Sequence, residues 1–309
     1  MKTFRSNGKL LISGEYVVLD GAKALALPTK YGQSLSVEEN SSNKMVWQSH
    51  DENGDIWYED MFSINDGQIQ EQYSTDTKND NEISHRLVQI LKATQDLNPE
   101  FLSSHKGYTI VTHQDFNRKW GLGTSSTLIN NIANWAKVNA YRLLHKTFGG
   151  SGYDIACAQH SSPLTYELGP EAKPKVNTVS FNPNFKDQLY FVYLNQKQNS
   201  RDGIKAYRSL GKVDNSIIAK INRLTEAMIV SSSRLDFEDL ITEHEHIIAE
   251  LIEQPTIKSK QFRDFDGAIK SLGAWGGDFI LVSAATNPRA YFNSKGFDTI
   301  IPFDDMILQ

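Results

Sequence analysis

The chain has 309 residues, of which 39% are hydrophobic, enough for a substantial core in one large or two smaller domains. Lysine and arginine number 32 and aspartate and glutamate 37, so the net charge of -5 argues against a general nucleic-acid-binding protein. The single cysteine, Cys157, excludes an internal disulfide and indicates a reducing compartment. No apolar run reaches the roughly 18 residues that span a bilayer, and residues 1–13 do not resemble a signal peptide. We therefore expect a soluble cytoplasmic protein with neither a nucleic-acid nor a membrane partner.

The first forty residues predict a series of short strands. Apolar and β-branched residues flank Ser13-Gly14-Glu15, so residues 9–19 are expected to form two strands around this tripeptide. Asp20-Gly21 is a hairpin-type turn signal. Further strands are expected over residues 22–26 and 33–38.

Two charged residues interrupt this apolar segment. Lys9 stands at the head of a predicted strand, and Glu15 lies between two of them. Either both extend their charged ends into solvent at strand termini, or they belong to a functional site.

Residues 44–80 are polar with interspersed aromatic residues, and they predict strands and loops over a partly exposed surface. The aromatic residues are Trp47, Trp57, Tyr58, Phe62 and Tyr73. A helix capped within residues 79–81 and reaching about Asp96 follows, because apolar residues recur there at helical spacing. The next predicted strand covers residues 107–112 and leads into a glycine-rich turn.

This turn, Gly121-Leu122-Gly123-Thr124-Ser125-Ser126, precedes a predicted helix. Glycines free the backbone to adopt positive φ, and the start of a helix offers unpaired N–H donors that suit a phosphate. The alternative is a tight turn followed by an ordinary N-cap. No acid occurs between Asp115 and Asp154, whereas five basic residues do, which favours a bound polyanion; they are Arg118, Lys119, Lys137, Arg142 and Lys146.

A second run of small residues, 148–152, includes Ser151 and Gly152 and precedes a short apolar helix. Asp154 lies in the first turn of this helix, where a carboxylate can complement the helix dipole or serve as a functional group at the floor of a crevice. Cys157 has no nearby histidine or cysteine in sequence and is expected to be a buried core thiol.

The second half of the chain predicts strands over 164–168, 176–181 and 188–194, and then long helices. Asn182-Pro183-Asn184 is the best candidate for a domain boundary. The helices are expected over residues 202–210, 214–231, 236–253 and 259–272. After them come a third glycine-rich turn, 273–277, and two final strands over 279–284 and 297–301.

His244 and His246 are two residues apart on the third of these helices, so they point to different faces and do not form a metal pair. We expect both on a solvated helix surface.

Three common site types are excluded by their motifs. A dinucleotide-binding turn would need a third glycine at Ser126 and an acid about 20 residues later. The chain contains no Gly-x-x-x-x-Gly-Lys-Ser/Thr loop, so it is not a P-loop protein. It also contains no Gly-x-Ser-x-Gly nucleophile elbow, so a serine hydrolase of that type is not expected.

The ordered set of three separated motifs resembles the GHMP small-molecule kinases over nearly the whole chain. Residues 8–21 resemble the opening motif of this family, Gly121–Ser126 its phosphate loop, and Gly273–Asp278 its closing glycine motif. The Gly-Glu-Tyr, Gly-Tyr-Asp-Ile-Ala and Gly-Gly-Asp sequences within and between these motifs are most similar to the mevalonate and phosphomevalonate kinase branch. So is the segment 197–203.

The resemblance implies an α+β, two-domain GHMP kinase fold. Residues 1–184 would form an N-terminal, ribosomal-protein-like, ATP-binding domain with a left-handed crossover, and residues 185–309 a C-terminal ferredoxin-like domain. The active site would lie between them and bind ATP and Mg²⁺.

The resemblance also implies roles for single residues. Asp154 would be the catalytic base, and Lys9 would keep it ionised and stabilise the transferred phosphoryl group. Ser125 would contact the magnesium ion. The acceptor would be bound by Glu15, Tyr16, Ser151 and Gly152, and the ATP phosphates by Gly121, Leu122, Gly123, Thr124, Ser125, Ser126, Gly273, Ala274, Gly276 and Gly277.

The expected activity is ATP-dependent transfer of the γ-phosphoryl group to mevalonate or phosphomevalonate. The alternatives are a related ATP-dependent decarboxylase, a sugar or homoserine kinase, a non-catalytic nucleotide-binding protein, and a structural protein whose glycine turns are only turns. The non-catalytic alternative is suggested by Leu143, which stands where the family has a magnesium-binding glutamate. The expected partners are ATP and a small anionic or hydroxylated substrate. The helix surfaces of the C-terminal half could either pair in a homodimer or be solvated, so the sequence leaves the oligomeric state open.

Overall fold

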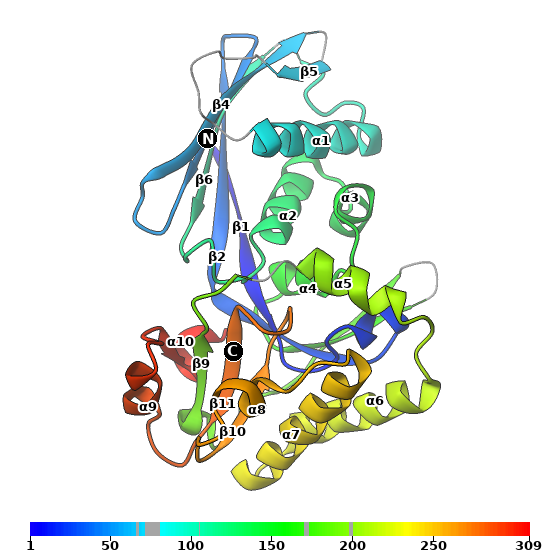
Figure 1. The fold of residues 1–309 in the computed structure, drawn as a ribbon. Coiled ribbons are helices and arrows are strands. Elements are labelled where there is room, and N and C mark those ends of the chain that lie inside the picture. Colours follow the sequence, from blue (N-terminus) through cyan, green and yellow to red (C-terminus); the bar gives the residue numbers. More distant parts are fainter. Residues whose placement is uncertain (66–67, 72–80, 105, 170–172, 198–199) are drawn as a thin grey trace. The chain divides into compact units, whose positions relative to one another are not determined.

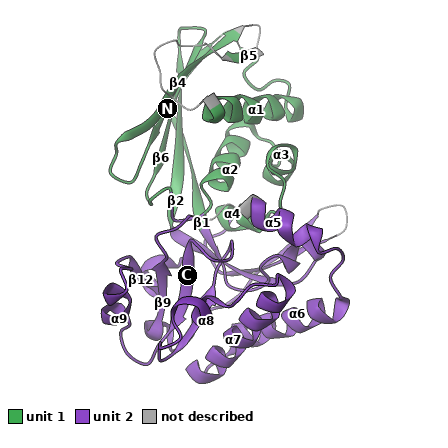
Figure 2. Ribbon diagram, viewed as in Figure 1, with its two compact units in different colours: residues 1–8, 31–118, 123–159 green, residues 9–30, 119–122, 160–309 purple. Residues whose placement is uncertain are grey.

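The computed structural model describes residues 1–309 except 66–67, 72–80, 105, 170–172 and 198–199, and the chain divides into two compact units (Figures 1 and 2). Unit 1 contains residues 1–8, 31–118 and 123–159, and unit 2 contains residues 9–30, 119–122 and 160–309. The predicted boundary at 182–184 lies within unit 2, and the division into domains 1–184 and 185–309 remains a prediction.

Unit 1 is built on a mixed sheet with the strand order β5-β4-β3-β6-β2. Neighbouring strands are antiparallel except for β3 and β6, which are parallel and are therefore joined by a crossover that includes helix α1. The elements are β3 (Lys44–His50), β4 (Ile56–Asn65), β5 (Gln68–Glu71), α1 (Asn81–Leu97), β6 (Gly107–Gln114) and the C-terminal part of β2 (Ala24–Asn40).

The helices of unit 1 lie on one side of this sheet, as Figure 2 shows for α1 to α3. They enclose a core to which the strands contribute Trp47, Tyr58 and Phe62, all buried. The prediction of a partly exposed surface is therefore wrong for these aromatic residues, because alternate side chains of β3 and β4 face the helices. Tyr73 lies outside the described residues. The remaining helices are α2 (Thr124–Ala136), α3 (Ala140–Thr147) and α4 (Tyr153–Gln159).

Unit 2 contains a four-stranded antiparallel sheet with the order β10-β11-β9-β12. The elements follow each other as one strand, a group of helices, two strands, a helix and a last strand. This is the connectivity of a ferredoxin-like β-α-β-β-α-β unit. The elements are β9 (Leu189–Tyr193), α5 (Ser200–Ser209), α6 (Asn215–Val230), α7 (Arg234–Leu251), α8 (Ile257–Gln261), β10 (Ala268–Ser271), β11 (Phe279–Ser283), α9 (Arg289–Ser294), β12 (Ile300–Pro302) and α10 (Phe303–Met306).

A second set of strands in unit 2 pairs with the N-terminal part of β2. Ala24–Ala26 pairs with β7 (Leu164–Leu168), which in turn pairs with β8 (Pro174–Thr178). The first strand of the chain, β1 (Lys2–Leu11), also pairs with β2. The described residues also include the short 3-10 helices η1 (Val17–Asp20) and η3 (Lys186–Gln188).

Local sequence signals account for most of the helices. Asp214 caps α6 by accepting the N–H of Ser216 at 2.7 Å, and Ser233 caps α7 by accepting the N–H of Asp236 at 3.3 Å. The predicted helices over 81–96, 202–210, 214–231 and 236–253 are confirmed within two residues at each end. No helix of the described residues is long and apolar enough to cross a bilayer.

Two element predictions are wrong. Residues 17–20 form η1 rather than a strand, and Gly21, with φ 87°, ends this turn instead of closing a hairpin. The predicted helix over 259–272 ends early, because β10 pairs with β11 in the sheet and this tertiary pairing overrides the helical spacing.

Candidate active site

The opening motif forms a tight bend after β1. Gly14 has φ 86°, and a Cβ at this position would lie 2.8 Å from the Cβ of Ala24, so only glycine fits. The N–H of Gly14 donates to Nε2 of His244 at 2.9 Å. The bend is therefore fixed from inside unit 2 by a side chain of α7.

Glu15 is only 1% exposed and forms an ion pair with Lys270 of β10, which is fully buried. Nε2 of His244 lies 3.5 Å from Oε2 of Glu15, and this oxygen has no hydrogen-bond donor among the described residues. The alternative that Glu15 extends into solvent at a strand end is therefore wrong, and so is the expectation that His244 lies on a solvated surface. His246, two residues on, is exposed on another face, as predicted.

Burial dominates the protonation of this cluster. Burial raises the pKa of Glu15 and of Glu245 above the ordinary value. The charge of Lys270 acts in the opposite direction on both groups but is the smaller effect. Burial and Lys270 hold the pKa of His244 well below its ordinary value, so the imidazole is neutral and Nε2 can accept the N–H of Gly14. Glu245 in turn accepts the N–H and the hydroxyl of Ser271 at 3.0 and 2.9 Å.

Tyr16 connects the opening bend to two other segments of unit 2. Its hydroxyl accepts the N–H of Trp275 in the closing glycine motif at 3.3 Å. Its ring stacks on Tyr207 of α5 with the centroids 5.5 Å apart, and Tyr207 donates a hydrogen bond to Asp20. A Cβ at Gly203 would lie 2.7 Å from the hydroxyl of Tyr16, so α5 approaches this ring closely.

The first half of the phosphate turn belongs to unit 2. The ammonium group of Lys9 donates to the carbonyl of Gly121 at 2.8 Å, and the Lys9 N–H donates to the carbonyl of Leu122 at 2.9 Å. A Cβ at Gly121 would lie 2.4 Å from a carboxylate oxygen of Asp278. Opening strand, phosphate turn and closing motif therefore meet at Gly121, where Asp278 as well as the φ of 67° requires glycine.

The second half of the turn begins α2 in unit 1. Gly123 is the N-cap residue with φ 96° and supplies no side-chain cap, so the helix start keeps N–H donors that a side-chain cap would have used. The hydroxyl of Thr124 accepts a hydrogen bond from Gln114 at 2.9 Å, the hydroxyl of Ser126 donates to Gly123 at 3.0 Å, and Ser125 is exposed. This geometry suits an anion better than a conventional cap.

The basic residues around the turn are less concentrated than the sequence suggests. The Arg118 guanidinium stacks on the ring of Trp57, and Lys146 pairs with Asp96 at 3.2 Å. Lys137 ends α2, about 20 Å along the helix axis from Thr124. Although the segment between Asp115 and Asp154 contains no acid, its basic residues Arg118, Lys137 and Lys146 are therefore not clustered at the turn.

Asp154 lies in the first turn of α4 in unit 1, and its carboxylate accepts the N–H of Ile155 at 3.0 Å. Gly152, with φ 90°, allows the sharp entry into this helix. A hydrogen bond of 2.9 Å from Gln159 to Asn130 joins α4 to α2, the helix that the phosphate turn begins. Asp154 is half-buried, and Cys157 on the same helix is fully buried, as predicted.

The closing motif begins at Gly273, two residues after Ser271. Gly273 and Gly276 have φ values of 66° and 88°, so the loop needs both glycines. Ala274 and Trp275 are buried, and Nε1 of Trp275 has no partner among the described residues.

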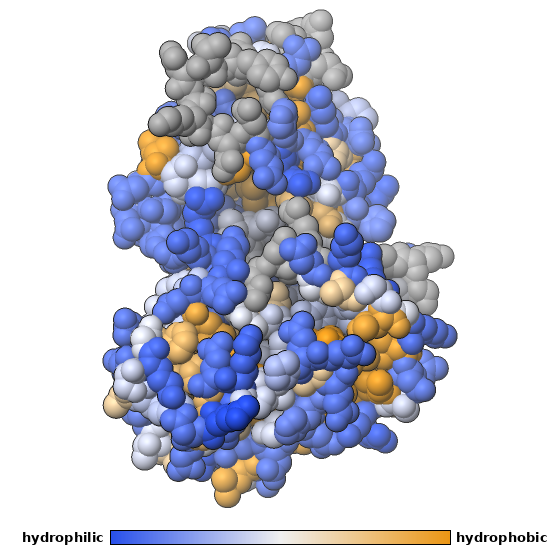
Figure 3. Space-filling view, in the orientation of Figure 1, coloured by the Kyte–Doolittle hydropathy of each residue, from blue (hydrophilic) through white to orange (hydrophobic). Residues whose placement is uncertain are grey.

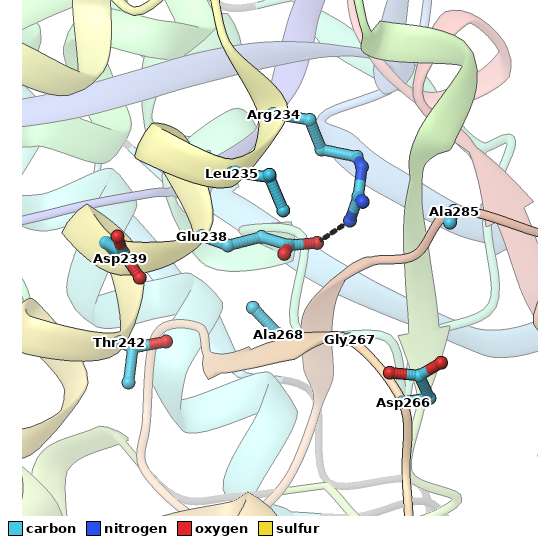
Figure 4. Close-up of a pocket in the computed structure, with 9 residues that line it drawn as sticks. All are labelled: Arg234, Leu235, Glu238, Asp239, Thr242, Asp266, Gly267, Ala268 and Ala285. Carbon is cyan, nitrogen blue, oxygen red and sulfur yellow. Dashed lines mark hydrogen bonds and ion pairs between the residues drawn. The ribbon is translucent and has the colours of Figure 1, made fainter.

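A separate hollow of about 320 Å³ lies in unit 2 (Figure 4). Figure 4 shows the ion pair between Arg234 and Glu238 inside it, and the hydroxyl of Ser283 also donates to Glu238 at 2.9 Å. No residue predicted for the active site lines this hollow, which is formed by Arg234, Leu235, Glu238, Asp239, Thr242, Asp266, Gly267, Ala268 and Ala285.

Lys270, His244 and Glu245 were missed by the sequence reading. The one local signal that could have indicated Lys270 is a lysine that follows Ala268-Ile269 and lies three residues before the glycine motif.

A magnesium ion that accompanies a nucleotide needs few protein ligands. Magnesium in such sites takes one or two carboxylates, phosphate oxygens and water, so a complete protein cage is unnecessary. The described residues contain no group of three or more acids, histidines or cysteines that could hold a metal alone. At the start of α2 in unit 1, Thr124 and Ser125 carry hydroxyl groups of the kind that can contact such an ion.

No protein-family model and no curated protein matches the sequence. Among solved structures, the Methanococcus jannaschii mevalonate kinase matches with a TM-score of 0.70 and 15% identity, over 100% of this chain and 98% of that one. The Streptococcus pneumoniae phosphomevalonate kinase in complex with phosphomevalonate and AMPPNP matches with a TM-score of 0.65 and 13% identity, over 100% and 98%. The Lactococcus lactis galactokinase complexed with galactose matches with a TM-score of 0.65 and 12% identity, over 95% and 88%. At these identities the likeness concerns the fold, and over its full length this chain has the α+β fold of the GHMP kinases.

Proposed function

We propose that the chain is an ATP-dependent small-molecule kinase that transfers the γ-phosphoryl group to a mevalonate-type acceptor, mevalonate or phosphomevalonate. The observation that carries this proposal is the meeting of three sequence motifs in unit 2. Lys9 binds the carbonyl of Gly121, Asp278 lies against Gly121, and Trp275 donates to Tyr16. If the glycines of these motifs served only isolated turns, the three motifs would not be expected to lie together in one unit.

The Gly121–Ser126 backbone would bind the triphosphate, with Ser125 reaching the magnesium ion. The Gly273–Gly277 loop would cover the phosphates. The uncapped start of α2 supplies N–H donors and a partial positive charge for this task. The solved phosphomevalonate kinase that shares the fold holds AMPPNP, an ATP analogue, which supports ATP as the phosphoryl donor here.

Asp154 would accept or orient the proton of the attacking oxygen, while Lys9 would keep Asp154 ionised and stabilise the transferred group. Ser151, Gly152 and Tyr16 would line the acceptor site. Glu15 would act on the acceptor through Tyr16, because its own carboxylate is buried against Lys270.

The mutation Asp154→Ala tests this assignment. A well-placed general base contributes about 10²–10⁴-fold, so we expect kcat to fall by that factor while the affinity for an ATP analogue changes less than about threefold. Asp55→Ala, at an exposed aspartate of unit 1, is the matched control. Turnover within a few fold of wild type would remove Asp154 from the mechanism.

The alternatives give different products. A decarboxylase of the same pathway would release carbon dioxide and inorganic phosphate, whereas a sugar or homoserine kinase would consume ATP only with those acceptors. A non-catalytic protein would bind ATP and turn over none of the acceptors, and Leu143, buried where the family has an acid, keeps this alternative open.

The proposal includes a homodimer. In Figure 3 the described surface is mostly hydrophilic, with apolar side chains in several separate places. Val230 at the end of α6 and Leu235 in α7 are exposed apolar residues that a second copy could cover. Sedimentation velocity of wild type and of Val230→Ser tests this, and a wild-type monomer at micromolar concentration would refute it.

A further inference from the structure

Asp278 is the residue of the closing motif whose position the roles above do not explain. Its N–H donates to the carbonyl of Gln196 at 2.7 Å, and its carbonyl accepts the N–H of Leu194 at 2.8 Å. Its backbone has φ 55°, in the left-handed region that aspartate tolerates better than most residues. The backbone is therefore fixed on both sides, and its side chain is directed at the phosphate turn.

The carboxylate of Asp278 fills the space where a Cβ of Gly121 would lie, with both oxygens within 2.8 Å of that point. The carbonyl of the same glycine accepts the Lys9 ammonium at 2.8 Å. Gly121 therefore has the Lys9 ammonium group at its carbonyl oxygen and the Asp278 carboxylate beside its α-carbon.

Two aromatic rings flank Gly121 and Asp278 along the chain. Trp120 and Phe279, the neighbours of Gly121 and Asp278 in sequence, pack edge to face with the centroids 5.6 Å apart. Tyr193 of β9 packs against Phe279 with the ring centroids 5.5 Å apart. The hydroxyl oxygen of Tyr193 is buried and has no partner among the described residues.

A carboxylate beside a phosphate turn repels a metal-free triphosphate, because like charges at short range in a partly buried site are weakly screened. A divalent cation between them reverses the sign of the interaction, since it binds carboxylate and phosphate oxygens together.

We propose that Asp278 is the protein carboxylate for the divalent cation of the bound nucleotide, in the role that Leu143 cannot fill. This inference rests on the proposed ATP site. It assigns to the closing motif a metal-binding task in addition to covering the phosphates, and it predicts that the chain binds the magnesium complex of ATP in preference to free ATP.

The test measures binding of a non-hydrolysable ATP analogue by calorimetry, with Mg²⁺ and with EDTA, to wild type, Asp278→Asn and Asp298→Asn. Asparagine keeps the size of the side chain and tolerates positive φ. Asp298 is an exposed aspartate of unit 2 and serves as the control. For Asp278→Asn we expect about tenfold weaker binding of the magnesium complex, comparable to the loss of one metal-site interaction, and about threefold tighter binding of the free analogue.

Opposite changes in the two affinities support the cation role. If Asp278→Asn weakens both affinities equally, the carboxylate only positions the turn, and the inference is wrong. Unchanged affinities with and without Mg²⁺ also overturn it. If wild type itself binds no analogue under either condition, the nucleotide site fails as a whole, which is distinguishable from a failure confined to Asp278.

Discussion

Removing the buried lysine of unit 2 tests how the opening bend and the closing motif are held together. Lys270→Met leaves the Glu15 carboxylate buried without its counter-ion, since Glu15 is 1% and Lys270 0% exposed. Loss of one partner of a buried pair typically costs about 3–5 kcal/mol, a large share of the 5–15 kcal/mol that is usual for a folded domain. Urea unfolding followed by tryptophan fluorescence near pH 7 measures this cost.

A second variant separates the charge from the lost packing. In Glu15→Gln/Lys270→Met neither charge is buried alone, so the double variant should be more stable than Lys270→Met, with a coupling energy of at least about 1.5 kcal/mol. The matched surface control is Lys220→Met, because Lys220 pairs with Glu243 at 2.8 Å while both side chains are nearly half exposed. That change should cost less than about 1 kcal/mol.

The pH dependence of this deficit has a defined sign. Burial raises the folded-state pKa of Glu15, and Lys270 lowers it, so Lys270→Met raises it further. A carboxyl group whose pKa is higher in the folded state than in the unfolded state stabilises the folded state at low pH. This stabilisation is complete below the pKa of the unfolded state and is lost as the pH rises through the pKa of the folded state. The deficit of Lys270→Met should therefore shrink as the pH falls from about 7 towards 5. Strictly additive single-mutant costs, or a deficit that grows in acid, would refute this reasoning.

Two further predictions concern the phosphate turn and the opening bend. Gly121→Ala should lose about 1–3 kcal/mol in a urea titration, because its Cβ would meet the Asp278 carboxylate, and Asp278→Gly in the same chain should recover the steric part; a stable single variant would contradict this. His244 has a folded-state pKa well below its ordinary 6.5, so the unfolded chain gains a proton that the folded chain cannot take, and stability should fall as the pH drops below about 6.5. His244→Gln should lack this fall in thermal unfolding between about pH 7 and 5.5, and equal slopes for both proteins would argue against it.

The elements that local rules govern could be predicted from the sequence. Asp214 and Ser233 cap the helices whose starts they mark, and the apolar spacing of α1 gives its helix within one or two residues. The glycines at 14, 121 and 276 adopt the positive φ that such turns need. Each of these features depends on a few consecutive residues.

The buried ion cluster could not be predicted because its members are distant in sequence. Glu15 and Lys270 are 255 positions apart, and Lys270 continues a helical spacing that ends in the structure where β10 pairs with β11. The sequence predicts His244 as a surface residue, because its partner, the N–H of Gly14, is 230 positions away along the chain. Likewise, Lys146 reads as part of a basic patch, yet it pairs with Asp96 of α1.

The proposed function stands on one chemical event, the transfer of a phosphoryl group from ATP to a small acceptor. ³¹P NMR of the chain with ATP, Mg²⁺ and, in turn, mevalonate, phosphomevalonate, homoserine and several sugars observes this event directly. We predict that ADP and one phosphorylated product appear in equal amounts with mevalonate or phosphomevalonate. An unchanged ATP spectrum with every acceptor, from protein whose thermal unfolding is also unaffected by ATP, would contradict the account.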